Sequence, residues 1–319
     1  MAERNYKQGE IIFREKEMGD SFFRITDGQV GVYSSYGTED EEKLSELGAG
    51  DYVGEMGLIE SYPRSATVVA LSDVTAEEVT GDEVDEYFKE APDKVLKMMK
   101  QLSSRIRKTT EEYKEVSAVI KEAQTSDKKE SLLDKLRNFA RIYRIRKEEA
   151  DGLSAENIRE IMKGSHSEGD TLQTDSYDEG TLIFKEGEKG TCMYDVHSGK
   201  VGIFSGYGTP EQHLIAEILP NEFFGEMGMI EKLPRSATAV ALEDDTFVEV
   251  FYEEDILKLF DINPMKLQMI LQHFSYRLRR ITKDYLEACK LAYEISEAGE
   301  GGASAKAGEF KASSAAASM

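Results

Sequence analysis

The sequence predicts an α+β protein built from two jelly-roll-like β domains, each followed by amphipathic helices. Two observations lead to this prediction. A fourteen-residue motif that begins at Gly54 recurs at Gly225, 171 residues later, and an internal repeat of this kind indicates copies of one structural unit. In each copy, short alternating runs separated by turn residues precede long stretches of helical periodicity.

The first part of each copy is predicted to form short strands. Gln29–Tyr33 and Lys200–Phe204 alternate as half-buried strands do, and turn residues such as Gly and Asp lie around them. Tyr6–Asp82 aligns with Tyr177–Glu253 without a gap, after which one extra residue shifts the helices to a spacing of 172. Many short strands at such intervals are typical of a β-sandwich or jelly roll.

The second part of each copy is predicted to be helical, because packing residues recur every three or four positions over several turns. This stripe fits an amphipathic helix that packs on its own domain, and it equally fits the seam of a homodimer. Its positions are Val95, Met99, Leu102, Ile106, Thr109, Tyr113, Val116 and Ile120, then Leu267, Leu271, Phe274, Leu278, Ile281, Tyr285, Ala288, Ala292 and Ile295.

These patterns divide the chain into a first domain at 1–126, a charged helical linker at 127–176, a second domain at 177–298 and a disordered tail at 299–319. Within the linker, Ser154 is predicted to cap a short helix that ends at Met162. A basic cluster lies in the same linker beside many acidic residues, so we expect a solvated helix face rather than a nucleic-acid contact. The cluster consists of Arg137, Arg141, Arg144, Arg146 and Lys147.

Composition excludes several classes of protein. The 319 residues include 62 acidic and 40 basic side chains, a net charge of −22, which opposes binding to DNA or to an anionic membrane. No apolar run reaches the length of a membrane span, and the N-terminus lacks the apolar core of a signal peptide. With only Cys192 and Cys289 present, a disulfide framework is not expected. These features favour a cytoplasmic protein.

Each motif combines the residue types of a phosphate site. Its Gly lets the backbone approach a ligand, the short turn that follows offers N–H groups to an anion, and its Arg supplies a charged planar fork that matches a phosphate. The carboxylate between them fits beside a phosphate if it accepts a hydrogen bond from a sugar hydroxyl, which indicates a nucleotide. The candidate ligand-binding residues are Gly54, Glu55, Met56, Arg64, Ser65 and Ala66, and Gly225, Glu226, Met227, Arg235, Ser236 and Ala237.

The two motifs resemble the phosphate-binding cassette of cyclic nucleotide-binding domains, as found in regulatory subunits of cyclic-AMP-dependent protein kinase and in the catabolite activator protein. The family pattern is Phe-Gly-Glu-Leu-Ala-Leu-Ile, a short gap, and Pro-Arg-x-Ala-Thr. Both copies match it at the Gly, Glu, Arg and Ala positions. Val53 replaces the Phe in the first copy, and Gly57 and Gly228 replace an Ala. The resemblance implies a β-roll fold for each domain.

The resemblance also implies roles for the charged residues. Glu55 and Glu226 would hold the ribose 2′-hydroxyl, while Arg64 and Arg235 would hold the cyclic phosphate with help from backbone N–H groups. The competing interpretation of each Arg is a surface ion pair with a neighbouring Glu. Recurrence of all four residue types at identical spacing argues against that interpretation.

The identity of the base stays open in the sequence. Ser65 and Ser236 follow the two Arg residues, and a hydroxyl there could accept a bond from guanine or contact the phosphate instead. The tandem layout favours cyclic AMP over cyclic GMP. Family sites are closed by an aromatic or apolar lid from the following helices, for which Tyr113 and Tyr285 are candidates, although core packing is their favoured role.

Enzyme functions find little support. The four His residues form no His-x-His pair, and neither a Gly-x-Ser-x-Gly motif nor a Walker loop occurs. We therefore expect no catalysis, no metal and no cofactor. Within these 319 residues we expect neither a helix-turn-helix after the last helix nor a basic inhibitor segment before the first roll.

The function predicted from the sequence is that of a cyclic-nucleotide sensor. Such a sensor transmits binding through helix rearrangement to a protein effector, for which a protein kinase is a candidate. The alternative is a scaffold protein that uses two non-binding rolls for assembly.

Overall fold

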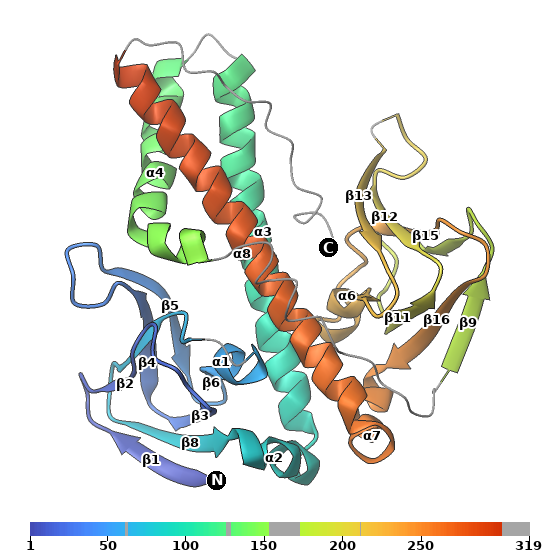
Figure 1. Cartoon of the computed structure of the whole chain (residues 1–319), viewed down its shortest axis with the longest axis horizontal. Coiled ribbons are helices and arrows are strands. Elements are labelled where there is room, and N and C mark those ends of the chain that lie inside the picture. Colours follow the sequence, from blue (N-terminus) through green and yellow to red (C-terminus); the bar gives the residue numbers. More distant parts are fainter. Residues whose placement is uncertain (61–62, 126–128, 153–172, 211, 302–319) are drawn as a thin grey trace. The chain divides into compact units, whose positions relative to one another are not determined.

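The computed structural model describes residues 1–60, 63–125, 129–152, 173–210 and 212–301 (Figure 1). The chain divides into two compact units, and each unit contains one β-roll. Among the described residues, unit 1 comprises 1–101, 112–152 and 285–301, and unit 2 comprises 102–111 and 173–284. The long helices after the rolls therefore contribute segments to both units.

The first roll consists of two four-stranded antiparallel sheets, ordered β1-β8-β3-β6 and β2-β7-β4-β5. Residues on the inner faces of these strands form its core, with Ile25, Val30 and Ala76 fully buried. The strands are β1 (Ala2–Tyr6), β2 (Ile11–Phe13), β3 (Ser21–Asp27), β4 (Gln29–Ser34), β5 (Glu42–Gly48), β6 (Tyr52–Val53), β7 (Thr67–Ala70) and β8 (Val74–Thr80).

Helices lie within and after this roll. The short helix α1 (Glu55–Glu60) occupies the first cassette, between β6 and β7. The 3-10 helix η1 (Gly81–Glu83), α2 (Val84–Glu90), α3 (Asp93–Thr125) and α4 (Lys129–Gly152) follow β8.

The second roll repeats the same topology, with sheets ordered β14-β11-β16-β9 and β10-β15-β12-β13. Its strands are β9 (Gln173–Tyr177), β10 (Leu182–Phe184), β11 (Cys192–Ser198), β12 (Val201–Ser205), β13 (His213–Ile218), β14 (Phe223–Phe224), β15 (Thr238–Ala241) and β16 (Thr246–Tyr252). Its helices are α6 (Glu226–Ile230) in the cassette, then α7 (Glu253–Ile262) and α8 (Pro264–Gly301). The predicted α+β class with two rolls is confirmed.

The position of the extra residue in the repeat differs from the gap-free alignment. Ala2 pairs with Glu78, whereas its equivalent Gln173 pairs with Val250, so the spacing is already 172 within β16. The extra residue therefore lies in the turn between β15 and β16. Asp245 in that turn has a φ of +54°, a left-handed conformation that Asp tolerates better than most residues. A surface turn absorbs an insertion without moving either strand.

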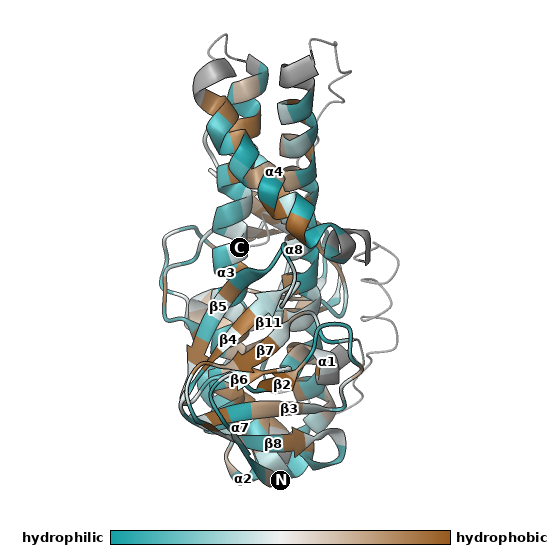
Figure 2. Cartoon of the chain, turned by 90° about the vertical axis from the view of Figure 1, so that its left-hand side faces the viewer, coloured by the Kyte–Doolittle hydropathy of each residue, from teal (hydrophilic) through white to brown (hydrophobic). Residues whose placement is uncertain are grey.

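The helical stripes are buried within the chain. In α3 and α8 every stripe position is buried except Thr109 and Ile295, which are half-buried. Figure 2 shows hydrophobic and hydrophilic residues interleaved along these helices, as in amphipathic helices generally. This burial fits helices that pack within their own chain, and a homodimer through these helices stays a prediction.

The linker is only partly described. Helix α4 lies within the first half of the predicted linker. Three Arg residues of the basic cluster pair with carboxylates: Arg137 with Asp134 at 3.4 Å, Arg144 with Glu297 at 3.1 Å, and Arg146 with Glu149 at 2.8 Å. The predicted helix from Ser154 to Met162 lies outside the described residues, as do residues 302–319 of the tail.

Two predicted boundaries shift. Strand β9 begins at Gln173, inside the predicted linker, because an edge strand can pair through its backbone despite polar side chains. Helix α8 continues to Gly301, beyond the predicted limit at 298. Within the described ranges, no helix combines the length and apolar character needed to cross a membrane.

Candidate functional site

The glycine of each cassette adopts a conformation that other residues avoid. Gly54 has a φ of +82° and Gly225 a φ of +76°, both in the left-handed region that favours glycine. A Cβ atom on Gly54 would lie 2.5 Å from an Arg64 nitrogen, and one on Gly225 would lie 2.8 Å from an Arg235 nitrogen. Both positions therefore favour glycine because of their backbone conformation, and a Cβ at either one would also displace the guanidinium beside it.

The two cassette arginines are buried and held in the same way. Arg64 donates to the carbonyl oxygens of Gly54 and Ser21, each at 2.6 Å. Arg235 donates to the carbonyl oxygen of Gly225, and to that of Cys192 at 2.8 Å. Ser21 and Cys192 are the first residues of β3 and β11, so each arginine ties its cassette to the same strand of its roll.

An aromatic ring supports each guanidinium. The Arg64 guanidinium carbon lies 4.4 Å from the centre of the Phe13 ring, and that of Arg235 lies 4.2 Å from the centre of the Phe184 ring, a favourable cation–π geometry. Burial lowers the pKa of Arg64, although neighbouring carboxylates oppose the shift. Neither arginine forms the exposed surface pair that the sequence left as an alternative.

The cassette glutamates are also buried, with exposed fractions of 3% for Glu55 and 1% for Glu226. Glu226 forms an ion pair with Arg277 of α8, and Arg277 also donates to the Met227 sulfur at 3.8 Å. Burial lowers the pKa of Arg277 to about 10, so this side chain stays charged at neutral pH. The motif alone did not reveal Arg277, but its recurrence with Arg105 at the spacing of 172 was a usable signal.

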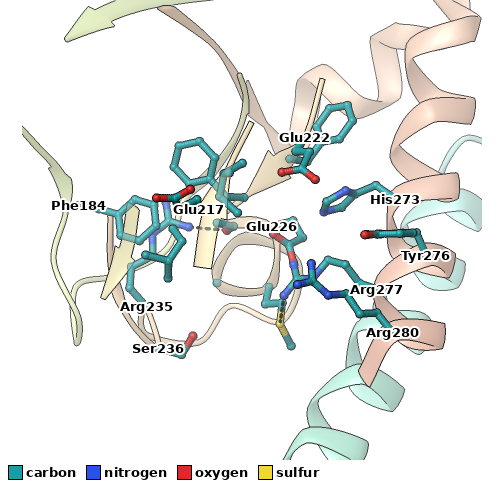
Figure 3. Close-up of a pocket in the computed structure, with 17 residues that line it drawn as sticks. Phe184, Glu217, Glu222, Glu226, Arg235, Ser236, His273, Tyr276, Arg277 and Arg280 are labelled. Carbon is teal, nitrogen blue, oxygen red and sulfur yellow. Dashed lines mark hydrogen bonds and ion pairs between the residues drawn. The ribbon is translucent and has the colours of Figure 1, made fainter. Parts of the chain in front are cut away.

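A pocket opens between the second cassette and α8 (Figure 3). His273, Tyr276, Arg277 and Arg280 project into it from α8, opposite the side chains of the roll. The empty space between these side chains amounts to about 630 Å³, open solvent at the mouth included. Roll and cassette contribute Phe184, Ile203, Glu217, Ile218, Glu222, Phe223, Phe224, Gly225, Glu226, Met227, Gly228, Arg235 and Ser236.

Five of the six residues predicted for the second site line this pocket, and Ala237 is buried beside Ser236 without lining it. In the first cassette, Glu55, Met56, Arg64 and Ala66 are buried and Ser65 is half-buried. Residues 61 and 62 of that cassette lie outside the described part of the chain. In both cassettes the predicted Arg thus donates to the carbonyl of the predicted Gly.

The two candidate lid residues, Tyr113 and Tyr285, are both buried. Tyr285 does not line the pocket of the second roll. This agrees with core packing for both. The aromatic side chain of α8 that faces the pocket is Tyr276 (Figure 3). Rotation of α8 about its axis decides which tyrosine faces the roll, and the sequence stripe could not fix that rotation.

Equivalent residues of α3 and α8 contact the strand before each cassette. Gln101 donates to the Tyr52 carbonyl at 2.6 Å and accepts from the Tyr52 N–H at 2.8 Å. His273 occupies the same position in the second repeat and packs edge-on against Phe223, with ring centres 5.4 Å apart. Burial lowers the pKa of His273 to about 3, so the imidazole is neutral at physiological pH.

Charges of both signs surround the second pocket. Burial raises the pKa of the Glu222 carboxyl, which accepts a 2.8 Å bond from the Leu219 N–H, while Arg280 and Arg277 favour its charged form. With Arg235, the pocket holds three guanidinium groups. Glu217, Glu222 and Glu226 line the same pocket, so the formal charges of its lining balance.

A second charged cluster lies at the start of α8. Asp195, His197 and Glu249 are close enough to hold a metal ion. However, Lys266 Nζ lies 2.5 Å from Asp195 and 3.1 Å from Glu249 and supplies a positive charge there. We therefore assign this cluster to fixing the first turn of α8 on the roll.

Comparison with known proteins identifies the family. The family model described as cyclic nucleotide-binding domain matches residues 3–91 and 174–263, more than half of the chain. The chain belongs to the cyclic nucleotide-binding domain family and carries two such domains. The resemblance seen in the sequence is confirmed.

Relatives with different ligands in their names match to a similar degree. The chain is 25% identical over 253 residues to a cAMP-dependent protein kinase regulatory subunit of Dictyostelium discoideum, covering 78% of this chain and 63% of the relative. It is 26% identical over 246 residues to human cGMP-dependent protein kinase 2, covering 77% and 25%.

A bacterial relative matches over a shorter stretch. The cyclic AMP receptor protein of Thermus thermophilus is 36% identical over 103 residues, covering 32% of this chain and 47% of the relative. This chain spans less than two thirds of the length of each of these three proteins.

Proposed function

We propose that this protein is a two-site cyclic-nucleotide sensor that binds one purine 3′,5′-cyclic monophosphate in each roll. The observation that carries the proposal is the buried Gly–Glu–Arg constellation, present in both cassettes and open to a pocket in the second. Its ligand-binding residues are the twelve cassette residues predicted from the sequence. A first domain at 1–126, a second domain that extends from β9 through α8, and a cytoplasmic location belong to the same proposal.

In this mechanism each arginine binds the cyclic phosphate. The Arg235 Nε group is buried and has no hydrogen-bond partner among the described residues. A buried unpaired donor is costly, and a phosphate oxygen would satisfy it with a charge-assisted bond. Backbone N–H groups near Gly225 and Ala237 would complete the phosphate contacts.

The glutamate of each cassette binds the ribose 2′-hydroxyl. In the second site, Glu226 already pairs with Arg277, so the hydroxyl must share this carboxylate with a side chain of α8. Nucleotide binding then changes the environment of Arg277 and favours a different docking position of α8. A ligand shifts such an equilibrium only through its differential affinity for the two arrangements.

For the base, we propose cyclic AMP over cyclic GMP, as the tandem layout suggested. Tyr276 replaces Tyr285 as the candidate for stacking on the base, a contact worth roughly 1–3 kcal/mol in other nucleic-acid systems. The output is proposed to be a protein partner, and the similarity to a kinase regulatory subunit makes a protein kinase the first candidate.

Isothermal titration calorimetry with cyclic AMP and cyclic GMP tests the proposal. The wild-type chain should bind two equivalents, with the higher affinity for cyclic AMP. Arg64→Ala and Arg235→Ala should each remove one site, because a lost charge-assisted bond costs about 1.5–3 kcal/mol or more. Arg235→Lys keeps the charge without the planar fork and should give an intermediate affinity.

Arg137→Ala, at an exposed ion pair on α4, serves as the control and should leave both sites unchanged. Absence of any binding heat from the wild-type chain would instead support the scaffold function. Normal binding by the double Arg64→Ala, Arg235→Ala variant would refute the assignment of the pocket.

A further inference from the structure

Two side chains from the helix after the first roll bind the cassette of the second roll. Ser103 and Arg107 lie one turn apart on α3, and both contact the carboxylate of Glu231, the residue that follows α6. Arg107 Nε donates to Glu231 Oε2 at 2.7 Å, and the Ser103 hydroxyl donates to Oε1. The segment Leu102–Glu111 belongs to the same compact unit as Glu231, so these contacts lie within unit 2.

The contact is protected from solvent. Ser103 is fully buried, and the Glu231 side chain is 10% exposed. Arg107 is 26% exposed. Hydrogen bonds to a charged group in such surroundings are stronger than exposed surface pairs, which contribute little. This contact can therefore hold a structural element in place.

Helix α6 joins this contact to the ligand pocket. Glu226 begins the helix on the pocket side, and Glu231 caps its other end with an N–H bond of 3.1 Å to the Met227 carbonyl. All five residues of α6 are buried. Because a packed turn of helix shifts as a body rather than deforming, a change at Glu226 must also displace Glu231.

The Ser and Arg that contact Glu231 recur in the second copy of the sequence repeat. The same Ser-x-x-x-Arg spacing recurs on α8 as Ser275 and Arg279, 172 residues later, and both residues are buried. Both helices follow a roll that carries a cassette, so the shared pair indicates a common structural role.

We propose that Ser103 and Arg107 are positioning residues of the second nucleotide site. By holding Glu231 they fix α6, and with it Gly225 and Glu226 at the pocket. Occupation of the pocket is passed to α3 through the same contact. This inference rests on the proposed function, because the pocket must bind a nucleotide for the effect to be seen.

The test uses the full chain with Arg64→Ala as the parent, so that binding of cyclic AMP reports on the second site alone. Arg107→Ala and Glu231→Gln should each weaken binding by about tenfold. The double variant should be no weaker than either single variant, because both remove the same contact. Arg107→Lys preserves the charge and most of the packing, and it should recover most of the affinity. Lys114→Ala, at an exposed position of the same helix, should match the parent.

Hydrogen exchange separates positioning from a merely structural role. Addition of cyclic AMP to the parent should change protection along residues 102–111, and this response should vanish in Arg107→Ala. If the parent binds cyclic AMP and Arg107→Ala retains the same affinity and exchange response, the inference is wrong while the proposed function stands. The Arg235→Ala chain, which keeps Arg64, reports on the first site alone. If this chain binds cyclic AMP and the parent does not, the second site is inactive and the inference is wrong. If neither chain binds, the proposed function falls with it.

Discussion

Single side chains set the chemistry of each cassette. A left-handed glycine brings the backbone against a buried arginine, and a buried glutamate follows it in the chain. The residues on the facing helix are less uniform. The contact that Gln101 makes in the first repeat through two hydrogen bonds is made in the second by His273, which packs against Phe223. This exchange places a titratable group in the core beside the candidate site.

His273 should make stability depend on pH. Its folded-state pKa of about 3 lies below the unfolded value of about 6.5, so below that pH the unfolded chain binds a proton that the folded chain does not. Above pH ~6.5 the protonation of His273 does not lower the free energy of unfolding. As the pH decreases from there toward 3, that free energy falls by about 1.4 kcal/mol per pH unit. His273→Gln, which copies Gln101, should remove this dependence. Denaturant unfolding of both proteins between pH 7 and 4 measures it, and parallel curves would refute the prediction.

The two long helices that follow the rolls are attached to the sheets in the same way. Each long helix after a roll is fixed in its first turn by a lysine that pairs with a glutamate on the sheet: Lys94 with Glu77 at 3.5 Å, and Lys266 with Glu249 at 3.1 Å. In the second roll Asp195 adds another carboxylate, and burial raises its pKa. Helix α8 therefore starts from a fixed point, and the residues further along can respond to a ligand.

Removal of the Lys266 side chain should destabilise unit 2 strongly. Lys266→Met would leave the buried carboxylates of Asp195 and Glu249 without their cation, and breaking a buried pair costs about 3–5 kcal/mol. Chemical denaturation followed by circular dichroism measures the change. Asp195→Asn in the same background should recover part of the loss, because it removes one of the two buried charges. Lys258→Ala at an exposed pair is the control, and an equally large effect there would argue against the interpretation.

The whole chain contains two copies of one structural unit, and the copies differ in side chains of the helix that follows each roll. The cassettes keep their Gly, Glu and Arg, whereas the facing helices differ, with Arg280 and Tyr276 in place of Lys108 and Ser104. Helices α3 and α8 each contribute residues to both units. Such helices can carry a response from a cassette to distant parts of the chain.

Hydrogen exchange of the full chain should reveal this response. Cyclic nucleotide should change protection at both cassettes and also along residues 95–120 and 267–295, since the helices re-dock when the cassettes become ordered. The Arg64→Ala, Arg235→Ala double variant should show no change. Protection that changes in the cassettes alone would mark a passive nucleotide binder rather than a sensor.

The sequence by itself determined the repeat, the fold class and the cassette residues, because each rests on local spacing. Gly225, Glu226 and Arg235 lie within eleven residues, and the alternation within short strands is also local. Only the tertiary structure decided which distant groups meet them. Arg277 reaches Glu226, Ser103 and Arg107 reach Glu231, and Tyr276 rather than Tyr285 faces the pocket. These contacts depend on how each helix is rotated and where it docks, and a periodic apolar stripe fixes neither to within a single residue.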